Sequence, residues 1–226
     1  TRLSRAPEAK TSVFDPDCRR CPRLARFLDD VAERYPDYHA RPVPAFGDPD
    51  PRLLIVGLAP GMHGANRTGR PFTGDFAGIL LYETLYRLGL ASSSVSQSAE
   101  DSLALEGCRI TNAVKCLPPA NKPTGEEIRN CNGYLAEELR VHGNSAVILA
   151  LGKVAHDAIV RARGEKLTAW KFVHGAVHRL PEGLTLVDSY HCSRYNTQTR
   201  RLTADMFRQV VREAATLAGL IPAGHE

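Results

Sequence analysis

The sequence predicts an α/β fold built on a parallel sheet. Four short apolar runs have the length of buried strands, and segments with helical apolar spacing lie between them. Strands that alternate with helices in this way pair in parallel, with the helices as crossovers. The 226 residues, 43% hydrophobic and 24% charged, fit one domain with an ordinary core or at most two small ones.

Composition excludes several classes of protein. No run of eighteen apolar residues is long enough for a transmembrane helix, and the first twelve residues lack the apolar stretch of a secretory signal. We therefore expect a cytoplasmic protein in a reducing setting, with no membrane partner. The net charge of +4 permits a nucleic-acid partner without demonstrating one.

The predicted elements follow in chain order. Residues 1–14 are polar and predict a loose arm, and residues 15–226 form the domain. Helical spacing of apolar residues follows Cys21, and residues 36–51, rich in proline and aromatic side chains, predict an ordered loop. The predicted strands are residues 53–56, 108–114, 146–151 and 184–188, with an edge strand within 174–180. The predicted helices are residues 78–88, 124–141, 152–163 and 201–218, with a helical turn within 99–105.

Local signals support two of these helix starts. Thr124 is the expected N-cap of the second helix, and Glu127, three residues later, completes a capping box. Gly152 opens the third helix directly after an apolar strand.

Three polar loops, residues 57–78, 115–123 and 189–199, each follow a strand and precede a helix. In a parallel sheet with right-handed crossovers such loops emerge at one edge, so we expect the functional site there. The first loop contains six glycines, which let a ligand approach the backbone. Its glycine spacing resembles a phosphate-binding loop, but the lysine that such a loop requires is missing.

Six cysteines are many for a chain in a reducing setting. Cys18 and Cys21 form a short chelating pair, and Cys116 and Cys131 flank the second loop. Four thiolates suit a zinc ion or an iron–sulfur cluster. The alternatives are that only the first pair binds a metal or that all are packing residues; the second pair favours a metal site. We expect Cys108 in the core and Cys192 as a non-ligand.

Four ordered motifs resemble the iron–sulfur uracil-DNA glycosylases. They are GLAPG, NRTGRPFTGD, ITNAVKCLPPANKP and SYHCSRYNTQTRR, and the resemblance extends from Cys18 to the last helix. The segments Gly69–Asp75 and His191–Thr199 resemble family 5, the type B enzymes, more than family 4. The resemblance implies a three-layer α/β/α sandwich with a four-stranded parallel sheet. It also implies a 4Fe–4S cluster on Cys18, Cys21, Cys116 and Cys131, with zinc as the alternative metal.

The implied activity is hydrolytic release of uracil from DNA in base excision repair, by a monomer and without strand cleavage. Other deaminated bases, such as hypoxanthine, are further candidate substrates. Such an enzyme rotates its target base out of the DNA stack and binds it in a pocket. Phe72 is the expected stacking platform, Asn112 the reader of the base edge, and His191 the group that stabilises charge on the leaving base. Each residue also has a structural alternative: Phe72 as a ring of the core, Asn112 as a cap of loop backbone, and His191 as a structural histidine.

Asp75 is the candidate for activating water or stabilising the cationic sugar, and it also suits the N-cap of the next helix. Asn121 is the candidate that positions the water or the sugar. Further substrate-binding candidates in the first loop are Leu58, Gly61, His63 and Asn66. The candidate DNA contacts are Arg194, Tyr195 and Arg200.

The chain departs from the type B pattern beside Asp75, where Phe76-Ala77 replaces the common Ala-Ser pair. Asn112 stands where family 4 has an asparagine that reads uracil. Two other functions stay open on the sequence: a protein that binds lesions or abasic sites without turnover, and a zinc-stabilised nucleic-acid-binding module.

Overall fold

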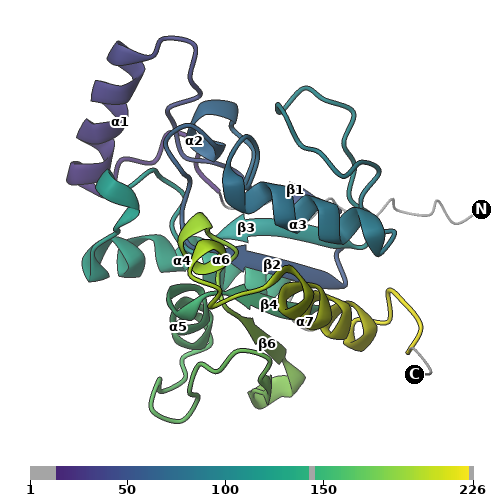
Figure 1. Cartoon of the computed structure of the whole chain (residues 1–226). Helices are drawn as coiled ribbons and strands as arrows, with labels where there is room; N and C mark the ends of the chain where they lie inside the picture. The colour runs from purple at the N-terminus through teal and green to yellow at the C-terminus, as the bar shows by residue number, and fades with distance from the viewer. Residues whose placement is uncertain (1–13, 143–145, 224–226) are drawn as a thin grey trace, which may run out of the picture.

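The computed structural model describes residues 14–142 and 146–223, so nearly all of the predicted arm lies outside the described residues. One mixed sheet of six strands runs through the molecule in the order β1-β3-β2-β4-β6-β5, and helices surround it (Figure 1). The strands are β1 (Phe46–Gly47), β2 (Leu53–Gly57), β3 (Cys108–Asn112), β4 (Val147–Leu151), β5 (Val177–Arg179) and β6 (Thr185–Ser189).

The centre of the sheet is parallel. β2 pairs in parallel with β3 and with β4, and β4 pairs in parallel with β6. These four strands are the four that the apolar runs predict. β5, within the predicted edge strand, and β1, within the predicted 36–51 loop, add antiparallel edges. The α/β class is therefore confirmed. The sheet is two strands wider than the four-stranded sheet that the resemblance implies, and of these two strands only β1 was not expected.

Helices cover both faces of the sheet, as its strand sequences require. Every residue of β2 is buried, so both of its faces need a covering layer. Leu53 and Ile55 face a core cluster that includes residues of α3 and α7, whereas Leu54 and Val56 face a cluster that includes residues of α4 and α5. These layers make the predicted α/β/α sandwich. The covering helices are α3 (Phe76–Arg87), α4 (Gly125–His142), α5 (Lys153–Ala162) and α7 (Ala204–Leu217).

The capping box predicted for α4 is confirmed. The backbone N–H of Thr124 donates to the Glu127 carboxylate at 2.7 Å, and the backbone N–H of Glu127 donates to the Thr124 hydroxyl at 3.2 Å. Arg23 of α1 (Pro22–Arg34) also contacts Glu127, with its Nε 2.7 Å from Oε1. The cap therefore holds α1 beside the start of α4.

The structure differs from the predictions in three connections. Residues 99–105 form no helix and contain only a turn at 99–100. The first loop contains α2 (Ala65–Thr68), and the third contains α6 (Arg194–Gln198), whose N-cap is Ser193. Both helices are too short to show an apolar period. Among the described residues, no helix is long and apolar enough to cross a membrane.

Candidate active site and four-cysteine site

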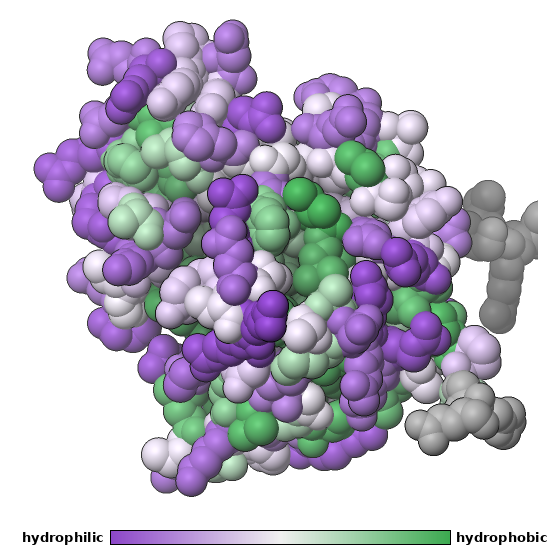
Figure 2. All heavy atoms as spheres, viewed as in Figure 1, coloured by the Kyte–Doolittle hydropathy of each residue, from purple (hydrophilic) through white to green (hydrophobic). Residues whose placement is uncertain are grey.

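A cavity of about 540 Å³ lies at the carboxyl ends of the parallel strands, and we call it the main cavity. All three predicted loops contribute to its wall, which confirms that they meet at one edge of the sheet. Hydrophobic residues are exposed on this face of the molecule near α3 (Figure 2). The predicted site residues that line the cavity are Leu58, Gly61, Phe72, Asp75, Asn112, Asn121, His191 and Arg194.

Phe72 is held in an unusual backbone conformation, with φ at 55°. Glycines make room for it: a Cβ at Gly78 would lie 1.7 Å from the Phe72 carbonyl oxygen, and one at Gly57 would lie 2.6 Å from its ring. The ring is buried and stacks on His191, with centroids 5.9 Å apart and planes at 26°. Phe72 therefore belongs to the core and to the cavity wall at once.

Asn112 ends β3 and is almost wholly buried. Its Oδ1 has no hydrogen-bond partner among the described residues. A buried carbonyl oxygen without a hydrogen-bond partner costs free energy. Its position on a cavity wall therefore favours a ligand that donates a hydrogen bond to it. The alternative, in which Asn112 caps loop backbone through this oxygen, has no contact to support it.

Asp75 is both the N-cap of α3 and part of the cavity wall. Its Oδ1 accepts from the backbone N–H of Gly78 at 2.8 Å. Burial raises its pKa, and hydrogen bonds from the backbone of Gly78 and Ala77 oppose that rise. The carboxyl group is therefore fixed in place by the helix start and destabilised as an anion, which makes it a better proton acceptor than an exposed aspartate.

His191 follows β6 and lines the cavity. Burial lowers its pKa to about 4, so the imidazole is neutral near pH 7. Its Nδ1 has no hydrogen-bond partner among the described residues. The backbone carbonyl of His191 accepts from the Asn196 amide at 2.8 Å, which fixes the loop. The ring is therefore positioned to exchange a hydrogen bond with a ligand.

Four predicted site residues do not line the main cavity. His63 is exposed, and its Nδ1 lies 2.8 Å from the Tyr38 hydroxyl. Asn66 is buried in α2, and neither polar atom of its amide has a partner among the described residues. Tyr195 on α6 and Arg200 after it are exposed, and each is next in sequence to an arginine of the cavity wall, Arg194 or Arg201.

The cavity wall also contains two aromatic residues that the sequence patterns do not single out, Tyr190 and Phe172. Tyr190 directly precedes His191, and the guanidinium of Arg201 lies 4.5 Å from the centroid of its ring. Position next to a predicted site residue is the signal that identifies Tyr190. Phe172 comes from the irregular segment between α5 and β5, where no pattern identifies it.

A second site gathers the four predicted metal ligands, Cys18, Cys21, Cys116 and Cys131, around one small cavity. Burial raises the pKa of Cys116 to about 12, and the charges of the other three thiols add to the rise. Two N–H groups point at sulfur: the Lys115 backbone N–H lies 3.2 Å from Cys131 Sγ, and the Asn130 amide lies 3.7 Å from Cys21 Sγ. Four thiolates this close repel one another unless a cation lies between them.

Cys108 and Cys192 lie apart from this site. Cys108 is buried in β3, as expected. Cys192 is wholly buried, and its Sγ donates to the Ala77 carbonyl at 3.4 Å.

One further cluster consists of side chains of the types that bind metal ions. His156, His178 and Asp188 bring their ligand atoms within 4.8 Å of one another. Both nitrogens of His156 are already used, with Nδ1 2.7 Å from Asp188 and Nε2 3.0 Å from the Trp170 carbonyl. Burial alone would lower the pKa of His156, but these hydrogen bonds outweigh burial and raise it. The group is therefore an ion pair that ties α5 to β6.

The fold and the main cavity define an α/β protein with an enzyme-like site at the carboxyl ends of its strands, supported by a separate four-cysteine site. Residues 44–215 match the family model described as the uracil DNA glycosylase superfamily. The chain is 50% identical over 208 residues to a type-5 uracil-DNA glycosylase of Thermus thermophilus, covering 90% of this chain and 94% of that protein.

Similarity extends to archaeal relatives. A type-5 uracil-DNA glycosylase of Pyrobaculum aerophilum is 43% identical, with 91% of each chain covered. A type-4 uracil-DNA glycosylase of Archaeoglobus fulgidus is 31% identical, with 74% of this chain and 79% of that protein covered. The chain belongs to the type-5 family of the uracil-DNA glycosylase superfamily.

Proposed function

We propose that this protein is a monofunctional DNA glycosylase that removes uracil from DNA by hydrolysis of the N-glycosidic bond. The observation that carries the proposal is the convergence of a buried carboxyl group, a neutral histidine and an unpartnered amide oxygen in one cavity. The names of its type-5 relatives support the same activity.

Recognition of the base falls to Phe72 and Asn112. The Phe72 ring offers an apolar face to a flipped base, since aromatic faces stack on bases of any sequence. The amide of Asn112 offers an acceptor and donors, which match the N3–H and O4 of uracil. Cytosine presents the opposite pattern at these positions, so the amide in one orientation discriminates against it. Hypoxanthine also carries an N–H beside a carbonyl, and we include it as a candidate substrate.

The chemical step falls to Asp75, His191 and Asn121. Asp75 accepts a proton from water as the water oxygen bonds to C1′ and the bond from C1′ to the base nitrogen breaks. The bonding electron pair leaves with the base, and His191 donates a hydrogen bond to the charge that develops on O2. A neutral imidazole serves here because it donates without first binding a proton. Asn121, beside the cavity on the turn Pro119–Asn121, positions the water or the sugar.

The four-cysteine site suits a 4Fe–4S cluster held by Cys18, Cys21, Cys116 and Cys131. Its contribution is structural: when bound, it cross-links the start of α1 to the second loop and to α4. Because that loop contains Asn121, the cluster supports the cavity from outside and takes no part in hydrolysis.

Partners follow from this chemistry. The substrate is DNA that contains uracil, bound by a monomer through Arg194, Tyr195 and Arg200 at the rim.

The decisive experiment measures uracil release from end-labelled DNA, with alkali used afterwards to reveal abasic sites. We expect abasic sites from single- or double-stranded uracil DNA and no strand cleavage before alkali. Cytosine at the same position is the control substrate. Tight binding to uracil DNA without product would favour the alternative, a lesion-binding protein.

A further inference from the structure

The main cavity has a neighbour that the proposed chemistry does not use. A groove of about 320 Å³, which we call the side groove, runs between the start of α3 and the 94–96 segment. It is lined by Phe72, Gly74, Asp75, Phe76, Gly78, Ile79, Ser94, Val95, Ser96 and Arg194. Four of these residues, Phe72, Asp75, Phe76 and Arg194, also line the main cavity, so the two spaces are adjacent.

Phe76 and Arg194 form the partition between the two spaces. The Arg194 guanidinium lies 5.1 Å from the centroid of the Phe76 ring, which links α3 to α6. Such a contact holds a flexible arginine in one position. Arg194 forms no ion pair within the described residues, so its charge is available to a phosphate group.

The walls of the side groove expose apolar side chains. Phe76 is 37% exposed, Ile79 63% and Val95 54%. Scattered exposed apolar residues need no explanation, but three that line one groove beside an enzyme-like cavity indicate a ligand with apolar faces. Phe76 and Ile79 lie on adjacent turns of α3, with Val95 on the facing loop.

The 94–96 segment, which faces α3 across the side groove, is held by hydrogen bonds although it lies at the surface. Arg70, 4% exposed, donates to Ser96 Oγ at 3.1 Å, to Asp101 Oδ1 at 2.5 Å and to the Ala99 carbonyl at 3.0 Å. The hydroxyls of Thr73 and Ser96 lie 2.6 Å apart. A buried arginine thus fixes the wall that presents Val95, so the groove is preformed.

We propose that the side groove binds the nucleotide adjacent to the flipped one, with its base against Phe76, Ile79 and Val95 and its phosphate on Arg194. This inference rests on the proposed glycosylase function. Continuity with the main cavity identifies the occupant, because a strand whose base enters the cavity must leave across the Phe76–Arg194 partition. Contact is through stacking and charge, so the groove tolerates any base.

The test uses single-stranded oligonucleotides with one uracil. The nucleotide next to the uracil, on the 5′ or on the 3′ side, is either intact or lacks its base. We expect removal of one neighbouring base, on one side only, to lower kcat/KM of the wild-type protein about tenfold. Phe76→Ala should lower kcat/KM about as much on the intact substrate. In this variant, removal of the neighbouring base should have little further effect.

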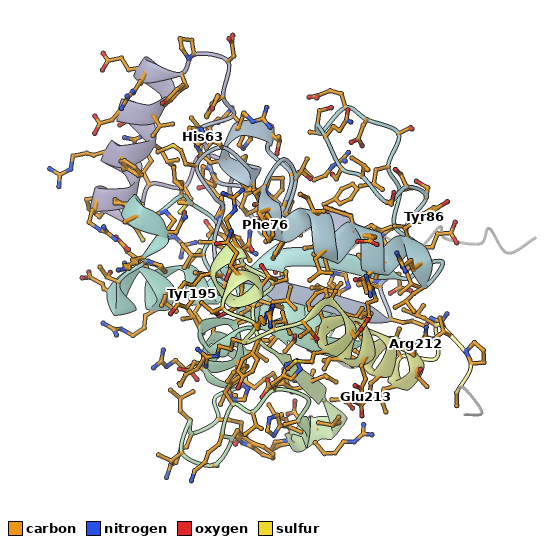
Figure 3. All side chains as sticks on the ribbon, viewed as in Figure 1. His63, Phe76, Tyr86, Tyr195, Arg212 and Glu213 are labelled. Atoms are coloured by element: carbon orange, nitrogen blue, oxygen red, sulfur yellow. The ribbon has the colours of Figure 1, made fainter. Side chains whose placement is uncertain are left out.

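Tyr86→Ala is the matched control, since Tyr86 is a 51% exposed aromatic residue at the other end of α3 (Figure 3). It should match the wild type on every substrate. Arg194→Gln should raise KM and make KM depend less steeply on salt, because one phosphate contact is lost. Thermal unfolding of each variant establishes that it is folded.

Two results would overturn the inference and separate it from the proposed function. If uracil is released equally well with and without either neighbouring base, the groove does not bind that nucleotide and the glycosylase function stands. If the losses from Phe76→Ala and from base removal multiply, the two act independently and the groove assignment is wrong. Absence of uracil release from every oligonucleotide would reject both proposals.

Discussion

The backbone of Gly64 lies against the side chain of Asp75: a Cβ at residue 64 would lie 2.6 Å from both Cβ and Oδ2 of Asp75. The same carboxylate lies near Gly61, but there a Cβ would be 3.6 Å from Oδ2, an ordinary contact. The first loop is therefore folded tightly around Asp75 at one glycine and loosely at another.

This contrast predicts different effects for two alanine substitutions. Gly64→Ala should displace the Asp75 carboxylate and lower kcat on uracil DNA by about 100-fold, since a small misplacement of a reacting group has effects of that order. Gly61→Ala should lower it far less. Single-turnover assays measure the rates, and equal losses in the two variants would show that contact with Asp75 is not the cause.

Asp75→Asn separates the capping role of Asp75 from its chemical role. Asparagine caps helices about as well as aspartate, so the melting temperature should change little. Uracil release should fall by about 10²- to 10⁴-fold because the proton acceptor is gone, while DNA affinity is retained.

Thr203→Ala is the control for loss of a cap alone. The Thr203 hydroxyl caps α7 by accepting from the Met206 N–H at 3.1 Å. This variant should lose about 1 kcal/mol of stability and keep its activity. An Asp75→Asn protein that is as active as the wild type would exclude Asp75 from the chemistry.

His191 should make the free energy of unfolding depend on pH. Its pKa in the folded protein, about 4, lies below the ordinary value of 6.5. Between these values the unfolded chain binds a proton that the folded chain does not, so stability is fully present above pH 6.5 and is lost as pH falls towards 4.

Thermal unfolding from pH 7 to pH 4 measures this effect. The melting temperature of His191→Asn should fall less steeply than that of the wild type. Parallel curves for the wild type and His191→Asn would contradict the assigned shift.

The four-cysteine site predicts a coloured protein. Material purified without oxygen should be brown with broad visible absorption if a 4Fe–4S cluster is bound, and colourless if zinc is bound. Cys116→Ser should lose iron and stability together, because metal binding contributes to folding free energy. The buried Cys108 is the matched control: its Sγ only donates to the Leu90 carbonyl, at 3.6 Å, so Cys108→Ser should keep the iron. Full iron content in Cys116→Ser would reject the ligand set.

The sequence predicts the framework well because the framework depends on apolar pattern. The apolar runs at 53–56 and 146–151 have the length and composition of buried strands. Thr124 with Glu127 identifies a helix start without tertiary information. β1 is missed because two residues, Phe46 and Gly47, carry no period.

The site is predicted in part, because the motifs that resemble the iron–sulfur uracil-DNA glycosylases point to Phe72, Asp75, Asn112 and His191. Their places at strand ends and in a glycine-rich loop agree with the resemblance but by themselves leave structural roles open. Contacts made across the fold leave no local signal, so neither Phe172 in the wall nor the pairing of Phe76 with Arg194 follows from the sequence. The positive φ of Phe72 likewise depends on the space that Gly57 and Gly78 leave around it.

The four-cysteine site also sets an order of events during synthesis. Cys18 and Cys21 leave the ribosome first, and Cys131 follows only after the first two parallel strands and the start of α4 have been made. At about 5–20 residues per second, the early thiols wait on the order of ten seconds for their last partner. A metal held by all four cysteines could therefore be bound completely only after synthesis of this half of the chain, and the Cys18–Cys21 pair stands without its two partner thiols throughout that interval.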